Sequence, residues 1–403
     1  MTATNTTVCI VGAGPAGVML GYLLARAGVP VTVLEKHADF LRDFRGDTIH
    51  PSTAHLMDEL GLGEQFARLP LRHIDTVSVV TDDGEYALAD FRRIPGRHTL
   101  GFLPQWDFLN FMAEHGKRYD GFDLRMQTEA VDVIRRGSRI IGVRTRDAQG
   151  VTSQIHADLV VAADGRDSVV RSAAGLDLIA HGAPIDVLWF RITRDDSDPD
   201  LLFGRLTRGH VLIMIDRGDF WQIAYVIAKG EYGRLRAQGL DAFRDRVGEL
   251  VPFLGARVQQ ITDQDDVKLL RVQINRLRRW WRPGLLCIGD AAHAMSPVGG
   301  VGINLALQDA VAAARILVGP LREGRLSQWH LARIQLRRAA PTMVIQAAQR
   351  LAQDRMLARV VSGEVAGRAP LALRLVDRVP ALQALPAWLV GHGVLPEHAP
   401  PAA

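Results

Sequence analysis

The stretch at residues 7–36 constrains the fold of this chain more than any other part of it. It reads TVCIVGAGPAGVMLGYLLARAGVPVTVLEK. An apolar run rich in β-branched residues leads into a glycine-rich turn. Helix-forming residues follow as far as Gly28, and a second β-branched run closes the stretch. This order predicts a strand, a helix and a second strand, the βαβ unit from which an α/β sheet is built.

The turn GAGPAG has the spacing G-x-G-x-x-G, at Gly12, Gly14 and Gly17, with Pro15 and Ala16 between the last two. Gly12 permits a tight turn, Gly14 lets a pyrophosphate approach the backbone, and Gly17 lets the helix pack closely on the strand. The helix start supplies amide donors and partial positive charge for phosphates. Because the turn joins a strand to a helix, it predicts a dinucleotide site rather than a glycine turn without a ligand.

The residue that ends the second strand narrows the choice of dinucleotide. Glu35 stands there and Lys36 follows it. A carboxylate at this position can accept hydrogen bonds from a ribose hydroxyl, and it disfavours a 2′-phosphate. The bound dinucleotide is therefore expected to be FAD or NAD rather than NADP, with both residues among its contacts.

A second motif, DLVVAADGRDSVVR at residues 158–171, has a strand that ends in Asp164 and Gly165. Asp164 could reach a ribose or a group bound to the pyrophosphate, and Arg171 could tether the segment through an ion pair. A plain strand, an Asp-Gly turn and a helix cap would explain the same residues.

A third motif, GLLCIGDAAHAMSPVGGVGINLALQDA at residues 284–310, repeats this logic. Its strand ends in a Gly-Asp pair whose carboxylate could bond a ribityl or ribose hydroxyl. Three glycines further along let the main chain pass close to a flat ring. Amides at the start of the next helix would stabilise negative charge on a reduced flavin. The candidate cofactor contacts in this motif are Gly289, Asp290, Gly300, Gly302, Ile303 and Asn304.

Taken together, the three motifs resemble those of the single-component FAD-dependent aromatic monooxygenases, the family of para-hydroxybenzoate hydroxylase. The resemblance covers about residues 8–310 and implies that the dinucleotide is FAD. It also implies that Arg45 lies beside the flavin and that Gln105 contacts the phosphate–ribityl region. The backbone of Val131 would meet the adenine, and the carbonyl of Pro297 would lie near the reactive edge of the ring. Arg45, Pro297 and His50 are the candidate catalytic residues.

The resemblance implies a reaction whose chemistry belongs to the cofactor. NADPH or NADH would reduce FAD and would bind transiently, because no second G-x-G-x-x-G follows a strand. The reduced flavin would react with O2 to a flavin C4a-hydroperoxide. This species would insert one oxygen atom into an aromatic, phenolic or polyketide-like small molecule. The alternatives are a flavin-dependent halogenase or a polyprenyl reductase on the same frame, and a non-catalytic FAD-fold binding protein.

A base or a hydrogen-bond relay would help to deprotonate a phenolic substrate. The candidates are His50, His73, His98, His210, Tyr225 and Asp47. Bulky residues in a later β-rich block could line the substrate pocket or fill the core of a sheet. These are Trp189, Phe190, Phe203, Met214 and Trp221.

The expected fold class is α/β: a Rossmann-like FAD-binding domain with an inserted β-sheet substrate domain and C-terminal helices. The FAD-binding domain is expected at residues 1–71, 100–180 and 275–325, the substrate domain at 72–99 and 181–274, and the helices and tail at 326–403. Pro341 is expected to kink or break the last helical region, and the tail from Pro380 to lie on the surface or fray.

Charge, cysteine content and the N-terminal sequence restrict partners and location. The formal net charge is +4, but the arginines are scattered among acids, which argues against a nucleic-acid partner. Cys9 and Cys287 stand in apolar strand-like runs, which is typical of buried thiols in a reducing compartment. The start carries no targeting signal, and glycines interrupt the apolar stretch at residues 8–34. A cytoplasmic monomer or homodimer without a membrane span is therefore expected.

Overall fold

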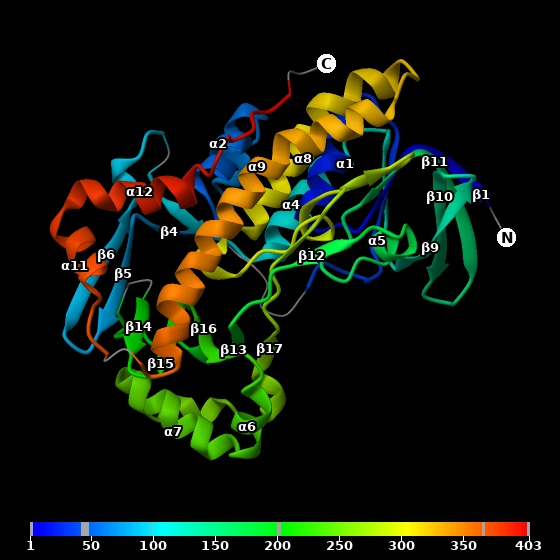
Figure 1. Ribbon diagram of the computed structural model, residues 1–403. Coiled ribbons are helices and arrows are strands. Elements are labelled where there is room, and N and C mark those ends of the chain that lie inside the picture. The colour runs from blue at the N-terminus through cyan, green and yellow to red at the C-terminus, as the bar shows by residue number, and fades with distance from the viewer. Residues whose placement is uncertain (1–2, 42–47, 97, 200–202, 365–366, 401–403) are drawn as a thin grey trace.

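The structure is a computed structural model that describes residues 3–41, 48–96, 98–199, 203–364 and 367–400. Within these ranges the strands form two large sheets and two small ones. Figure 1 shows the larger sheet with its helices on the right and the second large sheet at the lower left.

The larger sheet has eight strands in the described part of the chain, in the order β19-β20-β11-β1-β2-β8, and β10 and β9 extend it from β11. Its strands are β1 (Ala3–Val11), β2 (Val31–Leu34), β8 (Phe122–Arg125), β9 (Thr128–Arg136), β10 (Arg139–Asp147), β11 (Thr152–Ala162), β19 (Trp281–Arg282) and β20 (Leu285–Cys287). The strands from β20 to β8 are parallel, and their register sets Ala162 beside Val11 and Cys287. The carboxyl ends that precede the three motifs therefore share one edge of the sheet.

Helices cover one face of this sheet because their apolar stripes pack on its β-branched residues. They are α1 (Pro15–Arg26), α4 (Gln105–Gly116) and α8 (Gly302–Arg322). The stretch Val298–Arg322 is long and apolar enough to cross a membrane, but 78% of its most apolar window is buried inside the fold, as in a core helix. The ribbon of β9 and β10 and the helix α5 (Val169–Ala173) cover the opposite face.

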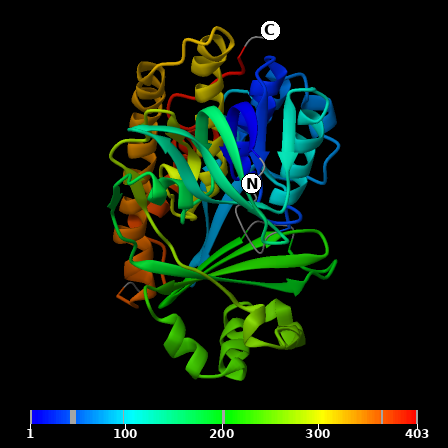
Figure 2. The same ribbon diagram turned by 90° about the vertical axis from the view of Figure 1, so that its right-hand side faces the viewer.

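The second large sheet is built from two separate parts of the chain, in the order β17-β13-β16-β15-β14-β5-β6. Its strands are β5 (Thr76–Thr81), β6 (Gly84–Asp90), β13 (Ile185–Thr193), β14 (Phe203–Thr207), β15 (His210–Asp216), β16 (Phe220–Ala228) and β17 (Lys268–Leu270). Side chains alternate between its faces. The outer face packs on α6 (Tyr232–Ala237) and α7 (Leu240–Leu250). Figure 2 shows these helices below the sheet and the domain of the larger sheet above its inner face.

Short elements connect the two sheets. One small sheet contains β3 (Thr48–Ile49), β4 (Arg72–Ile74) and β7 (Leu100–Phe102), and the other contains β12 (Leu178–Ala180) and β18 (Asn275–Leu277). The short helical elements are α2 (Pro51–Glu59), α3 (Gly63–Phe66), η1 (Phe91–Arg93), η2 (Pro252–Gln260), η3 (Gln264–Asp266), η4 (Gly289–Ala291) and η5 (Val298–Gly300).

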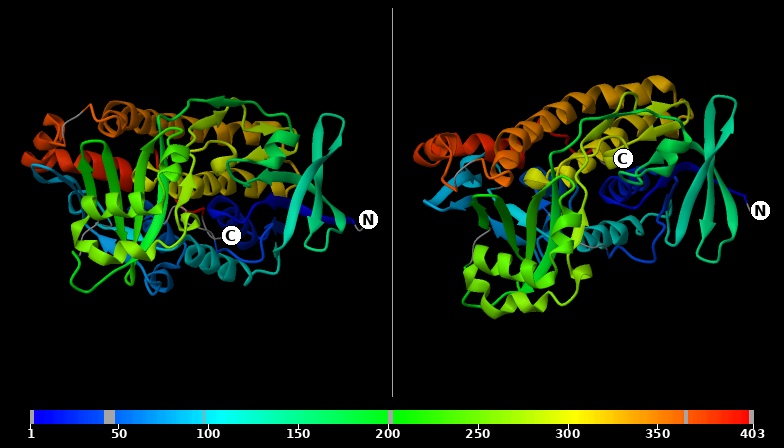
Figure 3. Two further views of the ribbon diagram at one scale, coloured as in Figure 1. Left: turned by 90° about the horizontal axis from the view of Figure 1, so that it is seen from below. Right: turned by 60° about the horizontal axis from the view of Figure 1, so that its bottom comes forward.

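The last part of the chain is helical and spans both sheets, as the long α9 does in Figure 3. Its helices are α9 (Gln328–Ala352), the π-helix η6 (Gln353–Leu357), α10 (Ala358–Val361), α11 (Leu371–Arg378) and α12 (Pro380–Gly391). Of the two outcomes expected at Pro341, a kink or a break, the break is wrong: α9 continues through this proline, which is buried, so packing outweighs the lost hydrogen bond. Of the two outcomes expected for the tail from Pro380, a surface position is confirmed, since Leu382 is 39% and Leu385 is 69% exposed. Fraying is wrong, because α12 begins at Pro380 and Glu397 is only 3% exposed.

Candidate active site

The carboxyl edge of the larger sheet brings the three motifs together. Gly12 follows β1, Asp164 lies two residues beyond β11, and Gly289 lies two residues beyond β20. These strands are hydrogen-bonded neighbours with their ends in register. A ligand that contacts all three motifs would therefore lie along this single edge, the usual place for a ligand in an α/β sheet.

The first glycine turn contains two glycines that the fold itself needs and one that it does not. Gly12 has a φ of 98°, and a Cβ there would lie 2.5 Å from the carbonyl oxygen of Ala163. A Cβ at Gly17 would overlap the carbonyl oxygen of Gly12. Among the described residues, no atom lies within 4 Å of a Cβ at Gly14, which is the uncapped N-cap of α1. The start of α1 is therefore open to a ligand.

Glu35 holds the glycine turn against the second strand. It is 9% exposed, and its carboxylate accepts hydrogen bonds from the N–H groups of Ala13 at 3.3 Å and His37 at 3.1 Å. Lys36 beside it is exposed. The acidic residue thus lies directly beside the turn, where a ribose next to the phosphates would be found.

Asp164 caps the short helix that follows it. Its carboxylate accepts hydrogen bonds from the Ser168 hydroxyl at 2.5 Å and from the Val170 N–H at 3.2 Å. Burial raises the pKa of Asp164, and these hydrogen bonds oppose the shift only in part. The local helix cap that the sequence left open is therefore present, and it sets the position of the turn.

Arg171 joins the second motif to the third. Its guanidinium donates to the carbonyl oxygens of Ala291 at 3.2 Å and Arg166 at 2.6 Å. The Arg166 side chain in turn lies 3.0 Å from an oxygen of Asp290. Within the described residues the contacts of Arg171 are these carbonyls and not the expected carboxylate, so the tether does not depend on an ion pair.

The loop at residues 297–301, called the glycine loop below, lies before α8. Gly299 and Gly300 have φ values of 77° and 62°, and a Cβ on Gly300 would overlap the side chain of Thr48. Helix α8 then begins at Gly302, and no described side chain caps it. Its first amides are therefore open to a ligand, as at α1.

The side chain of Asn304 is committed to the neighbouring helix. Its Oδ1 accepts the hydroxyls of Ser52 at 3.0 Å and Thr53 at 3.1 Å, both at the start of α2. The side chain of Ile303 is buried in the core of the larger sheet's domain. Ile303 and Asn304 would therefore contact a ligand at the start of α8 through their main-chain atoms.

Comparison with known proteins decides the family. Residues 5–348 match the model of a family described as "FAD binding domain". The 6-methylpretetramide 4-monooxygenase of Streptomyces rimosus is 34% identical over 386 residues, which are 94% of this chain and 91% of that protein. The chain belongs to the FAD-binding-domain family of FAD-dependent monooxygenases.

Solved structures show the same fold. The anhydrotetracycline hydroxylase OxyS from Streptomyces rimosus has a TM-score of 0.75 and 21% identity, and the match covers 99% of this chain and 78% of OxyS. The p-nitrophenol 4-monooxygenase PnpA from Pseudomonas putida DLL-E4 has a TM-score of 0.75 and 20% identity, with 96% and 94% covered. The monooxygenase described here therefore uses FAD, an aromatic or polyketide-like small molecule and O2, with the NAD(P)H donor typical of the family.

The cradle of the monooxygenase fits FAD. The side of Gly14 that a Cβ would fill is open, and the amides at the starts of α1 and α8 have no side-chain cap among the described residues. Helix starts of this kind stabilise phosphates and negative charge on a ring. Strand β9 begins beside Glu35, because the Thr128 N–H donates to its carbonyl at 2.8 Å, so Val131 follows close to this end of the cradle. Gln105 begins α4 and is half-buried.

His50 connects the glycine loop to the last helix of the monooxygenase. The side chain is fully buried, with Nε2 3.0 Å from the Gly300 carbonyl oxygen and Nδ1 2.7 Å from the Val390 carbonyl oxygen. Burial lowers the pKa of His50, and the two carbonyl contacts oppose the shift only in part. Both ring nitrogens face main-chain oxygens, so His50 is placed as a positioning residue for the glycine loop.

Replacing His50 with Gln or with Asn should show separately what its contact with Gly300 and its contact with Val390 contribute. In His50→Gln the amide can still donate to Gly300, whereas in His50→Asn it can donate only toward Val390. If the Gly300 contact positions the loop, His50→Asn should weaken FAD binding by about ten-fold, the value of one buried hydrogen bond, and His50→Gln should weaken it less. Flavin fluorescence titration of the apoprotein measures both, and equal losses would contradict this assignment.

Three buried glutamines of the C-terminal helices also hold the third motif, and none of them belongs to a motif of the sequence. Gln346 donates to the Ala294 carbonyl at 3.1 Å. Gln349 donates to the carbonyls of Ser296 at 2.9 Å and Val298 at 2.8 Å and accepts from the Ser296 N–H at 3.2 Å. Gln353 donates to the Ser296 hydroxyl. The glutamines are three and four residues apart, on one helix face, and this spacing was the available sequence signal.

Replacing Gln349 with Met should loosen Pro297 without unfolding the protein. One amide bonds the main chain on both sides of this proline, and its loss leaves three buried polar groups without partners, each worth about 1–3 kcal/mol. We expect FAD affinity to fall at least about ten-fold and the visible flavin spectrum to shift. Gln335→Met is the matched control, because Gln335 on the same helix bonds Trp280 and Arg278 instead. An unchanged flavin spectrum in Gln349→Met would contradict the prediction.

The other candidate bases are separated from the glycine loop by a sheet, are exposed, or are not described. His210 and Tyr225 bond each other at 2.6 Å, and Tyr225 lies on the outer face, against α7, so the sheet separates it from the loop. His73 and His98 are exposed. Arg45, which is expected beside the flavin, and Asp47, a candidate base, lie outside the described residues.

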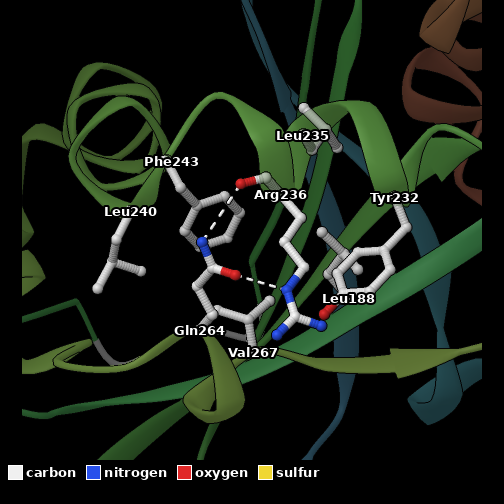
Figure 4. A pocket seen from close by; sticks show the side chains of 9 residues that line it. Leu188, Tyr232, Leu235, Arg236, Leu240, Phe243, Gln264 and Val267 are labelled. Carbon is white, nitrogen blue, oxygen red and sulfur yellow. Dashed lines mark hydrogen bonds between the residues drawn. The ribbon is translucent and has the colours of Figure 1, made fainter.

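The outer face of the second sheet also carries a small cavity, shown in Figure 4. It lies between β13 and the helices α6 and α7, and Arg236 and Gln264 bridge it through paired hydrogen bonds. Its volume of about 30 Å³ has room for about two water molecules. An aromatic substrate needs a pocket some ten-fold larger, so this cavity is not the substrate site.

Proposed function

We propose that this enzyme hydroxylates a polycyclic phenolic compound of the aromatic polyketide class. The observation that carries the proposal is the 34% identity over 94% of the chain to a protein named 6-methylpretetramide 4-monooxygenase. The inner face of the second sheet supports it, since its side chains in the described part of the chain form an apolar cluster that includes Trp189 and Ala224. A soluble, cytoplasmic monomer or homodimer is part of the same proposal.

The wall of the substrate site is the inner face of the second sheet. One cross-strand row on this face contains Trp189, Ala224, Ile213 and Gly204. Ala224 has only a methyl side chain and Gly204 has none, and Ile213 between them is 37% exposed, so the row leaves room for a flat ring. Val298 of the glycine loop packs on the same apolar cluster as Trp189. A substrate on this face would therefore meet the loop that borders the flavin.

FAD would be held along the carboxyl edge of the larger sheet. The turn at Gly12, Gly14 and Gly17 would hold the pyrophosphate, Glu35 the adenine-side ribose, and Asp290 the ribityl chain. The first amides of α8 would face the ring system. When bound, FAD supplies the redox chemistry with O2. The protein binds FAD, keeps water out and orients the substrate.

Trp189 is proposed to orient the substrate, because its indole Nε1–H is buried and has no hydrogen-bond partner among the residues that the structure describes. Trp189→Phe should raise KM about ten-fold, the value of one hydrogen bond, and change kcat much less. Trp221→Phe is the matched control: Trp221 is on the outer face, where its N–H bonds Asp198 at 2.8 Å. That variant should lose stability without a selective rise in KM. An unchanged KM in Trp189→Phe would contradict the assignment.

The function is tested by NAD(P)H oxidation with the purified yellow protein, peroxide being measured alongside. Simple phenols are compared with polycyclic phenolic polyketides, and the masses of the products are determined by mass spectrometry. We expect a polycyclic compound to accelerate oxidation and gain one oxygen atom. Acceleration by simple phenols alone would contradict the substrate class. Slow NAD(P)H oxidation with every compound, or oxidation that yields only peroxide, would favour the halogenase, the polyprenyl reductase or the non-catalytic binding protein. A product that has gained a chlorine atom would indicate the halogenase.

A further inference from the structure

Three side chains that can bind a metal meet on the surface of the molecule. They lie toward the C-terminal end of α2, away from the end of the helix that faces the proposed cofactor site. They are His55 and Glu59 of α2 and His398 of the segment after α12. His55 Nε2 lies 3.3 Å and His398 Nδ1 lies 2.6 Å from Glu59 Oε1. All three ligand atoms lie within 4.8 Å of one another.

The cluster is built by two independent constraints on the backbone. His55 and Glu59 are four residues apart on one helix, so their side chains share a face. The Ala399 N–H donates to Glu59 Oε2 at 2.8 Å, which leaves Oε1 to the two imidazoles. The adjacent Glu397 is buried and bonds Arg337 at 2.5 Å, so His398 is held beside α2. In Figure 1 the segment after α12 runs back across α9 toward α2.

We infer that His55, Glu59 and His398 form a binding site for Zn²⁺ or a similar late first-row divalent cation. Tetrahedral ligands at Zn–N and Zn–O distances of about 2.0–2.1 Å lie about 3.3 Å apart. The His55–Glu59 pair already has this spacing. The two exposed imidazoles need only small side-chain movements to complete the geometry, and water takes the fourth position.

The donor set also selects the class of metal. Two imidazole nitrogens and one carboxylate oxygen suit Zn²⁺, Ni²⁺ or Cu²⁺, whereas Mg²⁺ and Ca²⁺ prefer oxygen ligands alone. A bound metal would tie the segment at residues 395–400 to α2. The start of this helix bonds Asn304 at the beginning of α8. The metal would therefore brace the outer end of the element that supports the glycine loop.

The site is tested by titrating the FAD-loaded protein with Zn²⁺ in a calorimeter. We expect one Zn²⁺ per chain in the wild type and no saturable binding of Mg²⁺. Removing a residue that only hydrogen-bonds to a metal ligand lowers metal affinity by about ten- to hundred-fold. Removing a ligand itself should cost at least as much, so His55→Ala and His398→Ala should each weaken Zn²⁺ binding at least about ten-fold. Glu59→Gln keeps the shape and should weaken it as well. His73→Ala, an exposed histidine outside the cluster, should bind like the wild type.

Two outcomes would overturn the inference. One is equal Zn²⁺ affinity in the wild type and in the double variant His55→Ala/His398→Ala, with FAD still bound to both as evidence of folding. The other is amide hydrogen exchange at residues 395–400 that Zn²⁺ slows to the same extent in the two proteins. Slowing in the wild type alone supports the metal brace.

Discussion

The variant Gly14→Val should fold and fail to bind FAD. Gly14 has an extended backbone, with a φ of −69°, and no described atom lies within 4 Å of its Cβ position. Valine therefore fits the protein alone, and it occupies only the space left for the pyrophosphate beside α1. We expect FAD affinity to fall at least about hundred-fold, which corresponds to about 2.7 kcal/mol. Fluorescence titration of the apoprotein measures the affinity, and circular dichroism checks the fold.

The matched variant Gly17→Val should fail at the level of folding. A Cβ at Gly17 would overlap the carbonyl oxygen of Gly12, and backbone cannot move aside as a flexible side chain does. We expect little soluble protein, and no recovery by added FAD. If Gly14→Val were instead the less stable variant, or if it kept full FAD affinity, the proposed path of the pyrophosphate would be wrong.

Asp309→Leu should strongly destabilise the larger sheet's domain while still allowing it to fold. Asp309 is fully buried and accepts hydrogen bonds from the Gly289 N–H at 3.0 Å, His293 Nε2 at 2.6 Å and Arg338 Nε at 3.1 Å. Leucine would remove one carboxylate partner of Arg338, whose charge is buried because the residue is only 1% exposed. Breaking a buried pair in this way costs about 3–5 kcal/mol. The midpoint of denaturant unfolding of the apoprotein measures the loss.

The double variant Asp309→Leu/Arg338→Leu separates the buried charge from general loss of packing. Replacing both partners by apolar residues should recover at least about half of the stability. If the double variant is no more stable than Asp309→Leu, the loss comes from packing or from the Gly289 N–H and not from the stranded arginine.

The same network predicts a dependence on acid. Burial by itself would raise the pKa of Asp309, but His293 and Arg338 hold it below the usual value. Because the folded pKa lies below the unfolded one, the network stabilises the protein fully above about pH 4 and loses this contribution as the pH falls further. The wild type should therefore lose stability more steeply below pH 4 than the double variant does. Parallel curves would contradict this assignment.

The cofactor cradle could be predicted from the sequence because its parts are local. The turn at Gly12, Gly14 and Gly17 stands within a few residues, and both strand ends that follow, at Asp164 and Asp290, carry their own turn signal. Parallel strands put such ends on one edge of a sheet, so the approximate site follows once the strands are recognised. Local chemistry also places the hairpin of β5 and β6, which turns at the sequence DDG.

The partners of individual side chains were decided only by the tertiary structure. His50 was a candidate base from its residue type, but the fold sets its ring between Gly300 and Val390, which lie 250 and 340 residues away. Tyr225 was another candidate base. Side chains alternate between the two faces of the second sheet, and the pairing register puts Tyr225 on the outer face, on the far side of the sheet from the glycine loop.

By itself, then, the sequence determined the βαβ unit and the glycine cradle for a dinucleotide, because hydrogen bonds and steric limits between neighbours along the chain produce them. The choice of FAD followed from the resemblance to a known family. The tertiary structure alone decided which buried groups support the cradle: Gln349 at the glycine loop, Asp309 beneath Gly289, and Glu397 in a segment expected to lie on the surface or fray. Such contacts join residues that no local pattern relates, and they arise only when packing removes water from around polar groups that must then find partners.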